Sequence, residues 1–267
     1  MRMFGAKEPE NGEMSFFEHL DALRPRLLRS AAVLLLAMCA AFVCKEWLMA
    51  VITGPESPEF VTNRFFALLA DRMASDALRI NAHPLTLINT TMAGQFNMHL
   101  SLSFYTGLIV SVPYILWELW GFVRPALTER EVRAGRMLAF FVTLCFFAGV
   151  LFGYFVLSPL SVNFLSGYTV GDEISNMIDF GSYVSLVTTL SFVSGAVFLL
   201  PVLVSLLSRA GLLSAGFMKR YRRHALVVLA AMAALITPPD VASMVLVLLP
   251  LYGLYELSIG IAKRHNP

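Results

Sequence analysis

The chain has 267 residues, of which 57% are hydrophobic and 14% carry a charged side chain, with a mean hydropathy of +0.70 and a formal net charge of +2. A soluble domain of this length would be more polar, so the composition excludes that class and places the chain among membrane proteins.

Apolar runs near the length of about 20 residues that crosses a bilayer follow one another along the chain. Four are long and two are short, with a Pro-Pro-Asp turn between the short ones: 27–43 (extending toward 52), 98–117, 137–157, 183–207, 225–237 and 241–255. Counting the short pair as a hairpin gives six spans and puts both termini on one side. The sequence therefore predicts an all-α, polytopic membrane protein with six transmembrane helices, the last two short.

Lys and Arg are distributed unevenly between the two sides of this topology. Four of the 20 lie in the loop at 45–97, and the other sixteen lie in the tails and in the loops at 121–136 and 208–224. By the positive-inside rule both termini are cytoplasmic. The predicted organisation is a cytoplasmic N-terminal tail with a short amphipathic helix (1–29), a transmembrane domain (30–262) with external loops at about 45–97 and 158–182, and a cytoplasmic tail (263–267). A cleavable signal peptide is a rival interpretation of the first span, which the five later spans make unnecessary.

The first external loop contains apolar residues at helical spacing, namely Val61, Phe65, Leu68, Leu69 and Met73. This pattern predicts an amphipathic helix at the membrane interface or in a cap, with a disordered linker as the weaker alternative. The second external loop is expected to be a short ordered cap.

Residues inside the spans carry three further expectations. Pro201 should bend the fourth span because it lacks an N–H for the helical hydrogen bond. Gly149 and Gly153 form a GxxxG pair that indicates close helix packing. The three cysteines are expected to be small core residues outside any disulfide or metal framework: Cys39, Cys44 and Cys145.

The chain lacks a sequence pattern typical of an enzyme or of a bound cofactor. Its five histidines are scattered, and neither a phosphate-binding loop nor a nucleophile–base arrangement occurs. We therefore expect no catalytic residues, no metal and no cofactor.

Several carboxylates lie near or within membrane depth. Glu118 lies between Trp117 and Trp120 and is either an interfacial snorkelling residue or a binding residue. Glu256 interrupts the last apolar run, and it is either a functional intramembrane acid or a side chain exposed at the inner interface. Glu131 follows Thr128 at the spacing of a helix-starting capping box, as Glu18 follows Ser15, which leaves a structural role open for both acids.

The strings EHLDALRPRL, SVPYILWELWGFVRPALTEREVR, ITPPD and LPLYGLYE occur in this order over about residues 15–262. Together they resemble the TatC family, the receptor subunits of the twin-arginine protein translocase. The resemblance implies a six-span protein of the bacterial inner membrane that recognises folded cargo through an N-terminal signal with paired arginines. It also implies TatA-type and TatB-type partners, possible self-association, and transport driven by the proton-motive force. We expect lipid contacts and no nucleic-acid partner.

The family's acidic positions transfer unevenly. The interhelix-loop acid maps onto Glu131 and the acid of the last span onto Glu256. In the N-terminal motif His19, Leu20, Leu23 and Arg24 match, but Ala22 replaces the usual Glu. Glu18, on the same helical face, is slightly favoured over Asp21 as its substitute. Leu199 stands where many members carry a polar or acidic residue before the proline of the fourth span.

Two groups of candidate site residues follow from this resemblance. Signal-peptide binding is expected at Glu131, Glu18, Asp21, His19, Arg24, Glu118, Phe122, Pro125 and Leu127. Contact with partner subunits is expected at Thr237, Pro238, Pro239, Asp240, Met244 and Glu256. A rigid turn is an equal interpretation of the two prolines.

A small-molecule secondary transporter is the alternative function, and a scaffold without a substrate is a third option. A transporter would be expected to show inverted repeats and a polar site at the membrane midplane, and neither pattern is evident in the sequence.

Overall fold

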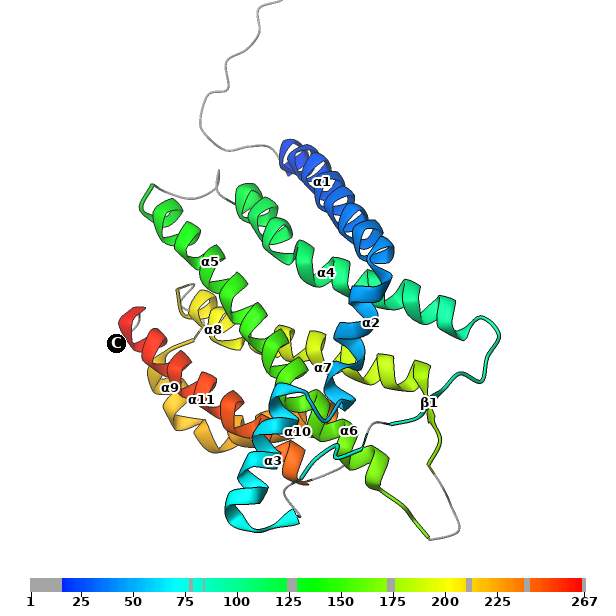
Figure 1. The fold of residues 1–267 in the computed structure, drawn as a ribbon. Helices are drawn as coiled ribbons and strands as arrows, with labels where there is room; N and C mark the ends of the chain where they lie inside the picture. The colour runs from blue at the N-terminus through cyan, green and yellow to red at the C-terminus, as the bar shows by residue number, and fades with distance from the viewer. Residues whose placement is uncertain are drawn as a thin grey trace, which may run out of the picture.

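The computed structural model describes residues 16–76, 79–83, 85–123, 129–171, 176–209, 213–237 and 241–265. At 16–22, 129–138 and a few positions near the C-terminal end (205–206, 209, 236, 242–243, 261 and 264–265) it describes only the backbone. The described chain is helical apart from one short strand pair (Figure 1). The helices are α1 (Phe16–Val43), α2 (Lys45–Thr53), the 3₁₀ turn η1 (Gly54–Glu56), α3 (Val61–Met73), α4 (Gly94–Val123), α5 (Glu129–Phe152), the π turn η4 (Gly153–Leu157), α6 (Ser158–Gly167), α7 (Phe180–Val197), α8 (Leu200–Arg209), α9 (Ala215–Arg220), α10 (Arg222–Ile236) and α11 (Val241–His265). The strands β1 (Leu87–Ile88) and β2 (Ile178–Asp179) pair in parallel.

Four helical segments of the described chain are long and apolar enough to cross a membrane: 23–43, 94–122, 139–167 and 180–204. The last two helices are shorter. α10 has 15 residues, or about 22 Å of helix, and the apolar part of α11 is Met244–Gly260. The prediction of a polytopic helical membrane protein with a short final hairpin is confirmed.

Glycines allow the long helices to approach closely. α1 lies along α4, and a Cβ placed on Gly107 of α4 would lie 2.7 Å from the backbone nitrogen of Met38. α5 and η4 pack on α7 at Gly149 and Gly153, where an added Cβ would lie 2.5 Å from the carbonyl oxygen of Ser194 and 2.6 Å from that of Leu190. The expected close packing at the GxxxG pair is confirmed.

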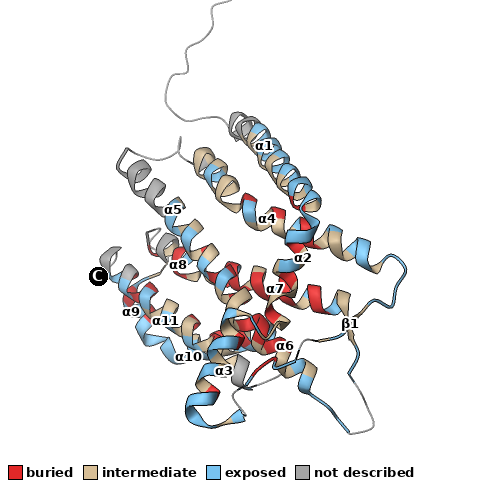
Figure 2. Ribbon diagram, viewed as in Figure 1, coloured by how far each residue is buried: buried red, intermediate tan, exposed pale blue. Residues whose placement is uncertain are grey.

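The fourth span is broken before Pro201, as predicted. α7 ends at Val197 and α8 begins at Leu200, so that the helical hydrogen bonds are rearranged immediately before the proline. α7 itself lies at the centre of the molecule, where Figure 2 shows most of the buried residues. Val184, Val187 and Leu190 are nearly inaccessible and anchor the two larger core clusters.

Three expectations differ from the structure. α1 runs without interruption through Pro25, so from Phe16 onward the expected short helix is continuous with the first span. Helix continues from α5 through η4 and α6 to Gly167, past residue 158, where the second external loop was expected to begin. Cys39 and Cys44 are exposed rather than in the core, because α1 packs along α4 and leaves its other side open to lipid.

The amphipathic helix predicted in the first external loop is α3. Its buried residues are Asn63 and Ala70, whereas Val61, Phe65 and Leu68 are exposed. The helix therefore forms part of a cap through a polar contact, and its apolar stripe faces outward. The same loop also supplies β1, which pairs with β2 through Leu87 and Ile178.

Candidate functional site

Three helix ends meet on one side of the molecule. α1 begins, α4 ends and α5 begins there, and α4 packs against both neighbours (Figure 1). The first turns of α1 contain Glu18, His19 and Asp21, and the first turn of α5 contains Glu131. The side chains of these four residues lie outside the described part, so the structure fixes the helix end on which each stands. The predicted acids therefore share this side of the protein with Glu118.

Glu118 is held in place by a residue of its own helix and by one of α1. Its Oε1 accepts a hydrogen bond of 2.8 Å from the hydroxyl of Tyr114, one turn earlier on α4, and lies 3.8 Å from Nη1 of Arg29 on α1. Only 12% of the Glu118 side chain is exposed, compared with 64% for Arg29. The carboxylate is therefore fixed and largely sheltered, while the guanidinium beside it remains in contact with solvent.

Arg26 fixes the backbone at the same place. Its Nη1 donates to the carbonyl oxygen of Glu118 at 3.1 Å. Gly121 makes room for this guanidinium, because a Cβ at that position would collide with Nη1. Two arginines of α1 thus bind the last turns of α4, which aligns the two helix ends.

The remaining predicted signal-binding residues fall around these helix ends. Arg24 is exposed on α1, and Phe122 is half-buried in the last turn of α4. Pro125 and Leu127 lie outside the described residues.

The predicted partner-contact residues lie on the last hairpin. Thr237 ends α10, is buried, and donates its hydroxyl hydrogen to the carbonyl oxygen of Ala233 at 2.9 Å. Met244 packs against the apolar cluster formed by α7, α10 and α11. The turn residues Pro238, Pro239 and Asp240 lie outside the described residues.

Glu256 stands away from the hairpin turn. Its Oε2 lies 2.7 Å from Nη2 of Arg222, the first residue of α10. The neighbouring Tyr255 hydroxyl donates to the carbonyl oxygen of Met218 in α9. The acid is therefore paired near the N-terminal end of α10, and a third of its side chain is exposed.

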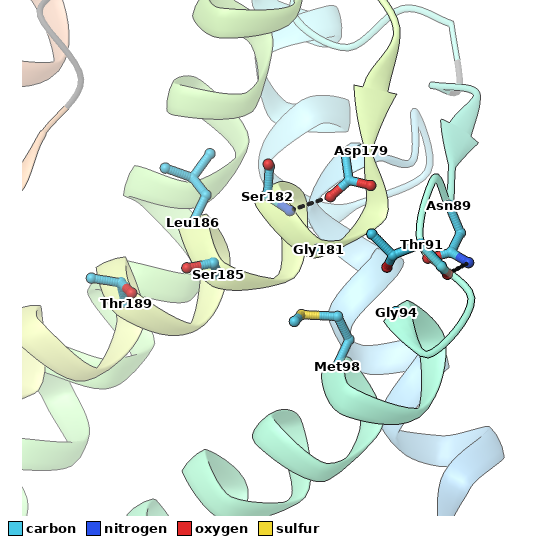
Figure 3. Close-up of a pocket in the computed structure, with 10 residues that line it drawn as sticks. All are labelled: Asn89, Thr91, Gly94, Met98, Asp179, Gly181, Ser182, Ser185, Leu186 and Thr189. Atoms are coloured by element: carbon cyan, nitrogen blue, oxygen red, sulfur yellow. Dashed lines mark hydrogen bonds between the residues drawn. The ribbon is translucent and has the colours of Figure 1, made fainter.

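A hollow of about 710 Å³, lined by both polar and apolar side chains, opens at the other end of α4 and α7 (Figure 3). Its walls come from the loop after β1, the start of α4 and the start of α7. Its carboxylate, Asp179, accepts a hydrogen bond of 3.1 Å from the backbone nitrogen of Ser182 and so caps α7. Asp179 has this structural role, and no predicted site residue lines the hollow. The hollow is therefore a weaker candidate for the functional site than the ends of α1, α4 and α5 described above.

Sequence reasoning missed the partners of Glu118. The spacing of Tyr114 and Glu118 by one helical turn was a usable signal. Arg26 and Arg29 were assigned to orientation alone, because their contact with α4 depends on how α1 packs. Within the described residues no group of three His, Cys, Asp or Glu side chains is arranged to hold a metal.

Comparison with known proteins gives concordant results. The family model for "Sec-independent protein translocase protein (TatC)" matches residues 18–250. A TatC of Blattabacterium sp. subsp. Periplaneta americana is 34% identical over 256 residues, covering 95% of this chain and 96% of the relative. A TatC of Deinococcus radiodurans is 32% identical over 258 residues, covering 96% and 88%.

Solved structures show the same likeness. A crystal structure described as the twin arginine translocase receptor TatC superimposes with a TM-score of 0.68 at 28% identity, covering 93% of this chain and 99% of that one. A second, described as the same receptor in DDM, gives a TM-score of 0.69 at 28% identity and covers 92% and 100%.

Proposed function

Since the chain belongs to the TatC family of Sec-independent protein translocase proteins, we propose that it is the receptor that binds paired-arginine signal peptides. The observation that carries this proposal is the gathering of Glu18, Asp21, Glu118 and Glu131 on helix ends at one side of the molecule. Carboxylates match a guanidinium in charge and in geometry, and they can accept two parallel hydrogen bonds from it.

Glu131 and either Glu18 or Asp21 are the proposed principal acids, because they stand in the first turns of α5 and α1. Glu118 is proposed to assist them. Exposed ion pairs each contribute only about 0–1 kcal/mol, so paired acids alone would bind a signal weakly. The apolar part of the signal must then add affinity by lying along the neighbouring helices or the inner leaflet.

The Arg29–Glu118 contact supports a mechanism of exchange. Their charged atoms are 3.8 Å apart, which is longer than a hydrogen bond, and Arg29 is mostly exposed. A guanidinium of the signal could replace that of Arg29 without leaving the sheltered carboxylate unpaired. Exchange avoids the cost of a partly buried charge without a partner.

The proposed orientation places this site in the cytoplasm, together with both termini. Sixteen of the 20 Lys and Arg residues lie in the segments assigned to that side. The hairpin turn at Thr237–Asp240 and Met244 would then lie toward the outer side and meet TatA-type and TatB-type subunits. Glu256, paired with Arg222 at the inner side, would serve that contact by fixing the hairpin. The proposed membrane is the bacterial inner membrane, and the proposed energy source is the proton-motive force.

The test is site-specific crosslinking of the membrane-embedded chain to a signal peptide that carries either Arg-Arg or Lys-Lys. The unmodified chain should crosslink to the Arg-Arg peptide and much less to the Lys-Lys peptide. Glu131→Ala should abolish the crosslink while leaving the protein in the membrane, and Glu59→Ala, in the external loop, should retain it. Unchanged crosslinking by Glu131→Ala would remove this acid from the site. Equal crosslinking of both peptides would refute the proposed function.

A further inference from the structure

A buried polar junction lies beneath the external cap. η1, the start of α3, the segment 79–83 and the start of α6 meet there. Asn63 donates to the carbonyl oxygens of Pro55 at 3.0 Å and Ser57 at 2.8 Å. Asn81 donates to the carbonyl oxygens of Pro159 at 2.9 Å and Pro55 at 3.2 Å. Two buried amides therefore hold the cap on the membrane-spanning part through backbone carbonyls.

Three side-chain atoms around this junction are buried and make no hydrogen bond within the described residues. They are Oε2 of Glu56, Oδ1 of Asn81 and Oγ of Ser161. Glu56 follows Pro55, whose carbonyl Asn81 contacts, and Ser161 lies two residues after Pro159, which Asn81 also contacts. Asn81 and Ser161 are 6% and 0% exposed. Buried polar atoms are nearly always paired, so each of these unpaired atoms calls for an explanation, above all the carboxyl oxygen of Glu56, which in its ionised form can only accept.

The groups around Glu56 do not stabilise a negative charge. α7 contributes the phenol of Tyr183, which donates to the carbonyl oxygen of Ile52, and η4 contributes Tyr154, which donates to that of Val51. α6 carries no titratable side chain. The charged or titratable residues of α2, of the loop after η1, of the first turn of α3 and of the segment 79–83 are all exposed: Lys45, Glu46, Glu59, Arg64, Arg79 and His83.

We propose that the sheltered carboxyl of Glu56 is a proton-binding site beneath the external cap, beside the junction formed by Asn63 and Asn81. A protonated carboxyl is neutral and carries an O–H donor, whereas a carboxylate is charged and only accepts, so protonation suits a place where Oε2 of Glu56 is buried and has no partner within the described residues. Release of the proton leaves a partly buried anion on the residue after Pro55, whose carbonyl oxygen both Asn63 and Asn81 contact, and so weakens the junction. The site thus makes the stability of the cap depend on pH.

The electrostatics of Glu56 agree with this geometry. Burial raises its pKa from 4.5 to about 7. The folded chain therefore holds this proton up to about pH 7, whereas the unfolded chain releases it near 4.5. Between these values the folded state binds more protons, so stability falls as the pH rises and changes no further above the folded pKa.

Two measurements on the purified full chain in detergent test the site. The first is thermal unfolding between about pH 5 and about pH 8.5 for the unmodified chain, Glu56→Gln and the control Glu59→Gln. Glu59 is exposed and three residues away, so both substitutions remove the same charge. We expect the unmodified chain and Glu59→Gln to lose thermal stability as the pH rises, and Glu56→Gln to lose the part of that dependence centred near pH 7. An unaltered pH dependence in Glu56→Gln would overturn the proposal.

The second measurement needs no variant, and it decides the matter if Glu56→Gln fails to fold. A hydrophobic carbodiimide reacts with protonated, sheltered carboxyl groups, and mass spectrometry locates the adduct. In the unmodified chain at about pH 6, Glu56 should be labelled several-fold more than Glu59, and its labelling should fall as the pH rises through 7. Equal labelling of the two acids, or labelling of Glu56 that does not change with pH, would contradict the proton-binding site.

Discussion

Arg222 and Glu256 join the two helices of the final hairpin at the end away from the turn, with 2.7 Å between Nη2 and Oε2. The pair sits beside the contact from Tyr255 to Met218, so α9, α10 and α11 are held together at one place. Because α10 is too short to cross a bilayer of ordinary thickness without accommodation, this closure helps to keep the hairpin in position.

The first prediction concerns this pair. Glu256→Gln should cost less than about 1 kcal/mol, because both partners are partly exposed. Arg222→Gln should destabilise the protein more, since it leaves an acid whose Oε1 is already buried and without a partner. Thermal unfolding in detergent measures both, and the double variant should resemble Glu256→Gln alone. A larger loss from Glu256→Gln than from Arg222→Gln would contradict this account.

The second prediction concerns Arg29 as the resident partner of Glu118. If the guanidinium of a signal peptide replaces that of Arg29, Arg29→Gln removes the competitor. Binding of an Arg-Arg peptide should then tighten by up to about five-fold, which corresponds to the loss of a competing ion pair of about 1 kcal/mol. Tyr114→Phe should weaken binding by a similar factor, because it frees the Glu118 carboxylate to move. Equilibrium binding of a labelled peptide provides the measurement.

The control for Arg29 is Arg64→Gln, which removes an exposed arginine from α3 in the cap. It should leave peptide affinity unchanged. If Arg29→Gln weakens binding, Arg29 contributes to the bound state and the exchange mechanism fails.

The third prediction concerns the α1–α4 interface. Gly107→Ala places a methyl group 2.7 Å from the Met38 backbone nitrogen, so the helices must separate, at a cost of about 1–3 kcal/mol. Gly253→Ala in α11 is the matched control, because nothing lies within 4 Å of the added Cβ. The comparison is made by thermal unfolding. If both variants lose similar thermal stability, the close approach of α1 to α4 at Gly107 is not the cause of the loss.

The fourth prediction concerns the polar face of α3. Asn63→Ala removes two donors from buried carbonyl oxygens and should cost about 1–3 kcal/mol. Asn176→Ala also removes two contacts to carbonyl oxygens, at Ser166 and Tyr168, but at an exposed position where water replaces them. It should cost much less. Proteolysis of the 45–97 loop should increase in Asn63→Ala and remain unchanged in Asn176→Ala.

The order and type of the helices could be read from hydropathy, because lipid requires long apolar helices and leaves few alternatives. The break before Pro201 and the close packing at Gly149 followed from the chemistry of single residues. The burial of Asn63 in place of Phe65 could not be foreseen. An amphipathic pattern indicates a helix, but it does not show which face packs against the protein. Beside a membrane the apolar face can contact lipid while the polar face contacts the rest of the protein.

The candidate site could be predicted only in part. Topology alone placed Glu131 and Glu18 on one side of the membrane. The partners of Glu118 depend on how α1 is rotated against α4. Gly107 and Gly121 allow this close packing, but the hydropathy of the sequence does not reveal the rotation.

The π turn at Gly153–Leu157 accommodates one more residue than an α-helical turn would. Deleting a single residue there would let α5 and α6 join as one regular helix, and α6 would rotate by about 100° relative to α5. The carbonyl of Pro159 would then turn away from Asn81, although no residue of the junction had been changed. A deletion in this turn is therefore expected to uncouple the cap while sparing the span itself.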